Sequence, residues 1–162
     1  MKMIERTLVL FKPDAVQRCV MGRILSRFED AGLKMVGAKM VWADKEMSKK
    51  HYAEHVEKGF YPGLESMITQ GPVLAFVLEG IEAVALVRKM VGGTEPKSAA
   101  PGTIRGDFAH TSYGWADKQG IGVKNLIHAS ATPEEAAQEV ALWFTDAELH
   151  SYKTVHDAHI LE

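Results

Sequence analysis

The order of strand-like and helix-like segments is the feature that most constrains this fold. Four short segments rich in apolar and β-branched residues predict strands, at 6–11, 33–43, 72–79 and 125–130. Segments of helical pattern or composition predict helices, at 21–31, 44–59, 62–71, 82–91 and 132–144. The order gives two β-α-β units in series, with a helical insertion between strands two and three. It predicts an α/β (α+β) fold of the ferredoxin-like, split β-α-β type, with helices packed on a four-stranded antiparallel sheet.

The boundaries of several helices are marked by residues that commonly start or end a helix. Gly32 and Gly92 follow two helical segments, where a residue with positive φ often ends a helix. The segment 132–135, TPEE, is a capping-box pattern with proline at the first helical position. A loop from about 92 to 124 is too long for a mere connection and is expected to be functional or disordered.

Length, charge and cysteine content limit the class of protein. The 162 residues suffice for one domain, and a net charge of −2 gives no global basic field for nucleic acid. The single cysteine, Cys19, excludes a disulfide within the chain and fits a reducing compartment. We find no apolar run of the roughly 20 residues that a membrane span needs, and no signal-peptide pattern at the start. We therefore expect a soluble cytoplasmic domain over 1–162, with a C-terminal tail at 145–162.

Three charged residues lie where the local pattern calls for apolar side chains. Lys12 ends the face formed by Leu8 and Leu10, while Arg88 and Glu139 lie within the apolar stripes of two helices. A charge on such a stripe is costly unless it is paired, extends to solvent or serves a site. Each one alone is more simply explained by a long side chain that reaches water. Together with Arg105 and a histidine, they are the components of a phosphoryl-transfer site.

His128 is the candidate nucleophile. Neutral imidazole has a free lone pair near pH 7, provided that an acceptor holds the proton on its other nitrogen. Glu139, directly or through Ser130, could be that acceptor. The alternative is a histidine satisfied within the core, and the local motif alone favours this alternative. In a regular strand Asn125, the only asparagine of the chain, would face away from His128, so it must precede the strand or the strand must be irregular.

Other candidate motifs are weak. His51 and His55 could offer two metal ligands, but no further ligands complete a set, so a solvated helix face is the expected role. Gly120-x-Gly122 is expected to be a flexible loop, since nothing makes it a dinucleotide fingerprint. The chain also has no P-loop pattern.

Several motifs in series carry a resemblance to a known family. The segments are RTLVLFKPDAVQR, HYAEH with FYPGL, GPVLAFVLEG, VRKMVGGTEP, PGTIRGDF, NLIHAS and EEAAQEVALWF. In this order and spacing the chain resembles the nucleoside diphosphate kinase family over nearly its whole length. The resemblance implies transfer of the terminal phosphoryl group of a nucleoside triphosphate to a nucleoside diphosphate, through a phosphohistidine and a ping-pong route. It further implies Mg²⁺, broad base use, and a homo-oligomer, either a hexamer or a tetramer.

The resemblance also assigns roles to residues. His128 matches the nucleophile, and Glu139, Ser130 and Tyr52 match the groups that orient it. The matching substrate-binding residues are Lys12, Phe60, Leu64, Arg88, Thr94, Arg105 and Asn125. Phe60 and Leu64 would contact the base, and Asn125 the sugar and phosphate region.

The chain also departs from the family pattern. Ala129 and Ala131 replace the usual Gly and Asp after the nucleophile, so Ala129 is expected to have negative φ and Thr132 to cap the next helix. Ala15 stands where the family usually has Gly. Residues 109–122 form an insertion, expected to be a surface hairpin or an intersubunit contact that leaves the site intact, or else merely a tolerated loop. The runner-up function is a regulatory module that binds nucleotides without turning them over.

Overall fold

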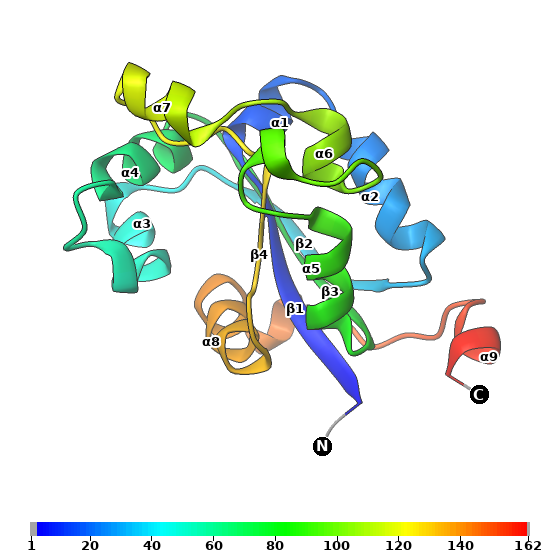
Figure 1. Cartoon of the computed structure of the whole chain (residues 1–162). Helices are drawn as coiled ribbons and strands as arrows, with labels where there is room; N and C mark the ends of the chain where they lie inside the picture. The colour runs from blue at the N-terminus through cyan, green and yellow to red at the C-terminus, as the bar shows by residue number, and fades with distance from the viewer. Residues whose placement is uncertain (1–2, 162) are drawn as a thin grey trace.

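The sheet of this protein has four antiparallel strands in the order β2-β3-β1-β4 (Figure 1). The computed structural model describes residues 3–161, so the two N-terminal residues and Glu162 of the expected 1–162 domain lie outside it. The strands are β1 (Ile4–Phe11), β2 (Lys34–Val41), β3 (Val73–Ile81) and β4 (Ile127–Ala129). The predicted α+β fold is confirmed, with β1 and β3 at the centre of the sheet.

Helices cover both faces of the sheet. The helices are α1 (Pro13–Gln17), α2 (Met21–Asp30), α3 (Lys45–His51), α4 (Tyr61–Thr69), α5 (Ala83–Val91), α6 (Ile104–Phe108), α7 (Tyr113–Gln119), α8 (Pro133–Trp143) and α9 (Asp157–Ile160). Single 3-10 turns are η1 (Ala53–His55), η2 (Pro96–Ser98) and η3 (Asp146–Glu148). None of the helices within residues 3–161 is long and apolar enough to cross a membrane.

The alternation of side chains along β1 explains the two helical layers. Val9 and Phe11 pack into a core with α2 and α5, whereas Leu8 and Leu10 pack into a second core with α4 and α8. All four side chains are fully buried. A strand that is apolar on both faces requires helices on both sides, which is why β1 lies inside the molecule. Figure 1 shows α2 and α5 on one side of the sheet and α8 on the other.

The start of α8 is capped as the sequence predicts. The Thr132 hydroxyl accepts the Glu135 backbone N–H at 3.1 Å, and the Glu135 carboxylate accepts the Ala131 N–H at 2.7 Å. Ala129 lies in β4 and is not among the residues with positive φ, as expected. The Thr132 cap and Glu135 therefore provide local hydrogen bonds where the family usually has Asp.

The segment before β4 is irregular. The predicted strand 125–130 shortens to three residues, and Leu126 has φ 72. The Asn125 carbonyl accepts the Ile127 N–H at 2.8 Å, so Leu126 is the centre of a γ-turn. Both alternatives raised by the alternation argument therefore hold, because Asn125 precedes the strand and the entry to the strand is bent.

Three further segments differ from their predicted form. The helix predicted at 44–59 ends at His51 and continues as η1, and the long loop of 92–124 contains η2, α6 and α7. The C-terminal tail is packed on the body of the molecule. His150 N–H donates to the Val36 carbonyl at 2.7 Å, and Lys34 pairs with Asp157 at 3.1 Å.

Candidate active site

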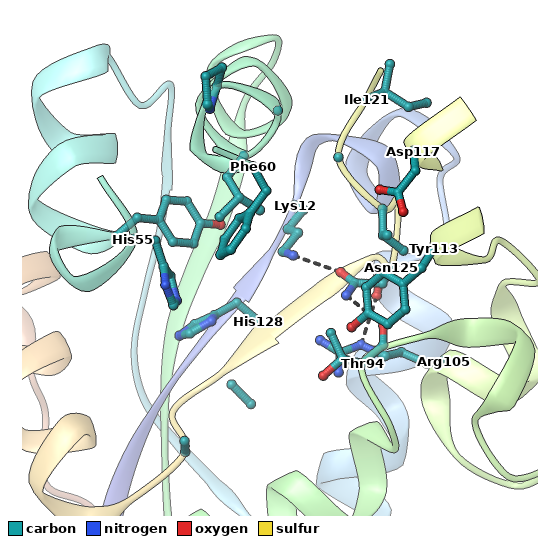
Figure 2. A pocket seen from close by; sticks show the side chains of 18 of the residues that line it. Lys12, His55, Phe60, Thr94, Arg105, Tyr113, Asp117, Ile121, Asn125 and His128 are labelled. Atoms are coloured by element: carbon teal, nitrogen blue, oxygen red, sulfur yellow. Dashed lines mark hydrogen bonds between the residues drawn. The ribbon is translucent and has the colours of Figure 1, made fainter. Parts of the chain in front are cut away.

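A cavity of about 880 Å³ opens at one end of β1 and β4. Side chains from the ends of strands and from the loops that follow them converge on it, as Figure 2 shows. Every substrate-binding residue implied by the resemblance lines it: Lys12, Phe60, Leu64, Arg88, Thr94, Arg105 and Asn125. His128 and Tyr52 line it too. Residues far apart in the sequence thus meet at one site.

The imidazole of His128 is oriented by a carboxylate behind it. His128 pairs with Leu10 across β1 and β4, so its side chain lies on the face of the sheet covered by α8. Its Nε2 lies 2.8 and 3.0 Å from the two oxygens of Glu139. An ionised carboxylate only accepts hydrogen bonds, so Nε2 is the protonated nitrogen and Nδ1 keeps the lone pair.

Ser130 fixes the position of Glu139. Its hydroxyl donates to Glu139 Oε2 at 2.5 Å and accepts the Leu8 N–H at 3.3 Å. Burial raises the pKa of Glu139, while the hydrogen bond from Ser130 and the neighbouring His51 oppose this rise. Of the two predicted arrangements, the direct one is present, because Glu139 contacts His128 itself and Ser130 bonds to the carboxylate without bridging it to the ring.

Burial keeps His128 neutral. Desolvation, with smaller contributions from Lys12, Arg105 and Arg88, lowers its pKa from the usual 6.5 to about 3. A protonated ring would have no free lone pair, so the low pKa means that the nucleophilic form is present at all ordinary pH values.

His51 is the site residue whose role sequence reasoning missed. The expectation of a solvated helix face is wrong for it, because its side chain is fully buried. The ring packs edge-on against that of His128, with centroids 4.5 Å apart, and Nδ1 accepts the indole N–H of Trp143 at 3.2 Å. Burial and the neighbouring His128 lower the pKa of His51 to about 3. Only contacts between α3, β4 and α8 reveal this second neutral imidazole.

Lys12 and Asn125 form one polar unit. Lys12 Nζ donates to Asn125 Oδ1 at 2.7 Å, and Asn125 Nδ2 donates to the Thr94 carbonyl at 3.0 Å. Burial, together with Arg105, lowers the pKa of Lys12 to about 8. The γ-turn at Leu126 positions Asn125, and Asp14 accepts the Leu126 N–H at 3.0 Å. A buried non-glycine residue with positive φ is strained, and here the strain directs a side chain into the cavity.

The two arginines are held by backbone carbonyls. Arg105 donates to the carbonyls of Asn125, Gly92 and Ile127 at 3.2, 3.2 and 2.6 Å, and Arg88 donates to that of Ala129 at 3.3 Å. Within residues 3–161 no carboxylate forms an ion pair with Arg88, Arg105 or Lys12. Three cations without a counterion make this cavity a site for an anion with several charges.

An aromatic ring stands at the mouth of the cavity. Phe60 is 56% exposed, although it borders the ordered start of α4, and its ring lies 5.5 Å from that of His55. Tyr52, by contrast, is buried, with a hydroxyl that has no hydrogen-bond partner in the described part of the chain. Burial raises the pKa of Tyr52. Tyr52 packs against His51, with ring centroids 4.6 Å apart.

The donor set of the cavity decides how a metal could bind. His51, His128 and Glu139 converge, but this set has two nitrogens and one carboxylate, which is poor for Mg²⁺. The remaining carboxylates on the cavity wall are Asp117 and Glu135. Two separate carboxylates do not make a protein cage for a hard cation, but they are compatible with one that arrives on phosphate oxygens.

The insertion at 109–122 is part of the cavity wall. Tyr113, Asp117 and Ile121 line the cavity, so the expectation of a surface hairpin is wrong, although the site itself is intact as expected. The segment forms α7 instead, and the side chain of Trp115 on it is 57% exposed. Gly122 is also not a mere flexible position, because a Cβ there would lie 2.9 Å from the Gly63 carbonyl oxygen.

A neutral imidazole facing a cavity lined by unpaired cations, on a split β-α-β sheet, defines a phosphotransferase. The family model for nucleoside diphosphate kinase matches residues 5–149. The nucleoside diphosphate kinase of Pyrococcus horikoshii is 51% identical over 94% of this chain and 93% of its own length. That of Thermus thermophilus is 51% identical over 90% of this chain and 99% of its own length. The chain belongs to the nucleoside diphosphate kinase family.

Solved structures agree with this assignment. A nucleoside-diphosphate kinase from Borrelia burgdorferi, a transition state mimic with bound vanadate and ADP, has a TM-score of 0.95 at 41% identity, over 98% of both chains. A halophilic enzyme from Halobacterium salinarum, in complex with CDP, has a TM-score of 0.87 at 45% identity, over 98% of this chain and 99% of its own. The protein is thus an enzyme, and the alternative of a binding module without turnover is not supported.

Proposed function

We propose that His128 carries the phosphoryl group between the two nucleotides. The observation that supports this role is the 2.8 Å contact of Nε2 with Glu139, which leaves Nδ1 as the nitrogen with a free lone pair. In the first half-reaction, the Nδ1 lone pair forms a bond to the γ-phosphorus of a nucleoside triphosphate. The bond from that phosphorus to the bridging oxygen breaks, and the diphosphate leaves with the electron pair.

The second half-reaction reverses these events. A terminal phosphate oxygen of another nucleoside diphosphate attacks the phosphorus, the N–P bond breaks, and the electron pair returns to Nδ1. Positive charge grows on the ring in the transition state, and Glu139, fixed by Ser130, stabilises it through Nε2–H. Neither half-reaction needs a water molecule, which fits a ping-pong route between two nucleotides that use one cavity in turn.

The remaining residues bind the nucleotide. Arg88, Arg105 and Thr94 face the phosphates, Lys12 and Asn125 the sugar and phosphate region, and the partnerless Tyr52 hydroxyl a phosphoryl oxygen. The base stacks on Phe60 beside Leu64. Stacking on an aromatic ring is worth roughly 1–3 kcal/mol per base and tolerates any base, so we infer broad base specificity. The relatives with bound ADP and CDP support this inference.

Mg²⁺ is the divalent metal that we propose for the reaction. It would be held by phosphate oxygens and water, with Asp117 and Glu135 near enough to the cavity to contact that water. Bound there, it neutralises phosphate charge as the phosphoryl group moves.

The domain extent, the oligomeric state and the cellular location are proposed from the family and its substrates. We propose one domain over 1–162 and a homo-oligomer, with a hexamer preferred over a tetramer. Edge strand β2 ends beside the exposed side chains of Met40 and Trp42, which suit an interface between copies. Nucleotide substrates and the free, exposed thiol of Cys19 fit the cytoplasm.

The proposal is tested by incubating the enzyme with γ-labelled ATP in the absence of an acceptor. An acid-labile, base-stable label on His128 that added diphosphate removes is expected. His128→Ala should give no label, whereas the matched control His150→Ala, at an exposed tail residue, should label as the native enzyme does. Full labelling of His128→Ala would exclude His128 as the carrier.

A further inference from the structure

Helix α7 is anchored beside the phosphate end of the cavity. The Tyr113 backbone N–H donates to the Glu95 carboxylate at 2.9 Å, and Glu95 directly follows Thr94. The Lys97 N–H donates to the Thr111 carbonyl at 3.0 Å. The inserted segment is therefore bound to the same loop that supplies Thr94 to the site.

The other end of the insertion is anchored beside the base platform. Gly122 packs against Gly63 so closely that a Cβ on Gly63 would lie 3.0 Å from the Gly122 nitrogen. Gly63 belongs to α4, which directly follows Phe60. The Thr111 hydroxyl also donates to the Lys124 carbonyl at 2.7 Å, one residue before Asn125. The insertion thus spans the cavity from its phosphate end to its base end.

Tyr113 is the residue of α7 that faces the cations. It lines the cavity, and in Figure 2 its hydroxyl end points toward Thr94 and Arg105. The side chain is 47% exposed, and its hydroxyl makes no hydrogen bond within residues 3–161. The Tyr113 hydroxyl, which donates to no described protein atom, therefore borders cations that have no carboxylate partner. The two side chains are near enough to interact, because Tyr113 is among the groups that raise the pKa of Arg105 against the lowering by burial and Arg88.

We propose that Tyr113 is a further phosphate-positioning residue of this enzyme, supplied by the insertion at 109–122. Its hydroxyl donates a hydrogen bond to a non-bridging phosphate oxygen of the bound nucleotide, on the side opposite the floor formed by Arg105 and Thr94. A phenol O–H remains protonated at neutral pH and donates well to an anionic oxygen. No bond to the base follows from this geometry, so the contact applies equally to every nucleotide. The inference rests on the proposed function, because it assumes that the phosphates lie against these cations.

The test uses Tyr113→Phe, which removes only the hydroxyl. Isothermal titration should show ADP binding weakened about five- to tenfold, while the binding of adenosine, which has no phosphate, stays unchanged. Tyr152→Phe is the matched control, because Tyr152 is equally exposed, at 47%, and lies in the C-terminal tail outside the cavity. It should bind both ligands as the native enzyme does.

Two outcomes would overturn the proposal. Unchanged ADP affinity in Tyr113→Phe would show that the hydroxyl has no ligand on the nucleotide. Equal losses for ADP and adenosine would show that the ring supports the base, the sugar or the wall instead of the phosphates. Labelling of His128 by saturating ATP separates these results from a failure of the proposed function, because Tyr113→Phe should still be labelled while a failed function leaves even the native enzyme without label.

Discussion

His128 shows how one partly buried residue combines two requirements that conflict in water. A nucleophilic imidazole must be neutral, yet it must also hold a positive charge as the phosphorus is attacked. Burial beside Lys12 meets the first requirement by lowering the pKa. Glu139, held 2.8 Å from Nε2, meets the second, since it stabilises charge only as charge develops.

The pKa values of His128 and Lys12 predict the pH dependence. A group with a depressed pKa near 3 stays deprotonated down to about pH 4, so the rate of His128 labelling at saturating ATP should be flat between pH 5 and 7. Lys12, with its pKa lowered to about 8, loses its charge as pH rises through that value, so the affinity for ATP should fall above pH 8. Rapid-quench labelling across pH 5–9 measures both effects.

A control and a contrary result are available for this profile. Lys12→Arg should retain its charge and so lose the alkaline decline in affinity, because the guanidinium titrates far above this range. A labelling rate that drops more than tenfold between pH 7 and 5 would show instead that His128 titrates near its ordinary pKa.

At the residue scale, the sequence identifies the charged residues of the site well, but it identifies poorly which buried side chains pack against one another. Lys12, Arg88 and Glu139 are visible as charges that interrupt apolar stripes, and the structure brings all three to one site. His51 carries no such signal. Its environment comes from His128 on β4 and Trp143 on α8, which local periodicity cannot place beside α3.

At the scale of elements, two of the disagreements with the predicted pattern lie next to the cavity. The pattern predicts a regular strand before His128, but a γ-turn at Leu126 replaces its first residues. The predicted loop after Gly92 contains α6 and α7, whose short lengths of 5 and 7 residues give little periodicity to recognise. Helices this short form only because tertiary contacts hold them, so sequence patterns alone do not reveal them.

The contact between the insertion and α4 predicts opposite effects for two glycines. In Gly122→Ala the added Cβ would lie 2.9 Å from the Gly63 oxygen, so the cavity wall should shift and ADP should bind several-fold more weakly. Gly114→Ala, within α7 and with nothing within 4 Å, should leave binding unchanged and stabilise the helix by about 0.5–1 kcal/mol. Titration calorimetry and thermal unfolding distinguish the two variants.

Two results would contradict these predictions for the glycine variants. If Gly122→Ala binds ADP as tightly as the native enzyme does, the close approach to Gly63 has no bearing on the nucleotide site. A Gly114→Ala variant that unfolds at a lower temperature would contradict the helical state of α7.

At the scale of the whole molecule, apolar patterning accounts for the sheet and its two helical layers. Residues 8–11 of β1 and 73–78 of β3 are continuously apolar, and only a strand segment buried on both faces has that pattern. The order of the strands follows from the β-α-β units. The number of copies in the assembly does not follow from any pattern within one chain. Exposed Met40 and Trp42 indicate a contact surface, but they do not indicate how many chains meet there.

The assembly is open to direct measurement. Light scattering of the purified enzyme should give a mass near six times the 17.9 kDa of one chain, because the family resemblance favours a hexamer. Four times that mass would select the tetramer. A mass of one chain would contradict a homo-oligomer and would leave the exposed β2 edge without the role proposed for it.

The γ-turn at Leu126 has a consequence for protein engineering. Its backbone conformation is one that glycine adopts freely and leucine does not, yet the leucine side chain is fully buried in the core. Automated design that scores only thermal robustness would straighten this turn into ordinary strand. In the redesigned chain Asn125 would turn away from Lys12, and the pocket would lose the sugar contact proposed for this residue. Position 126 should therefore be held fixed in any thermostabilisation campaign.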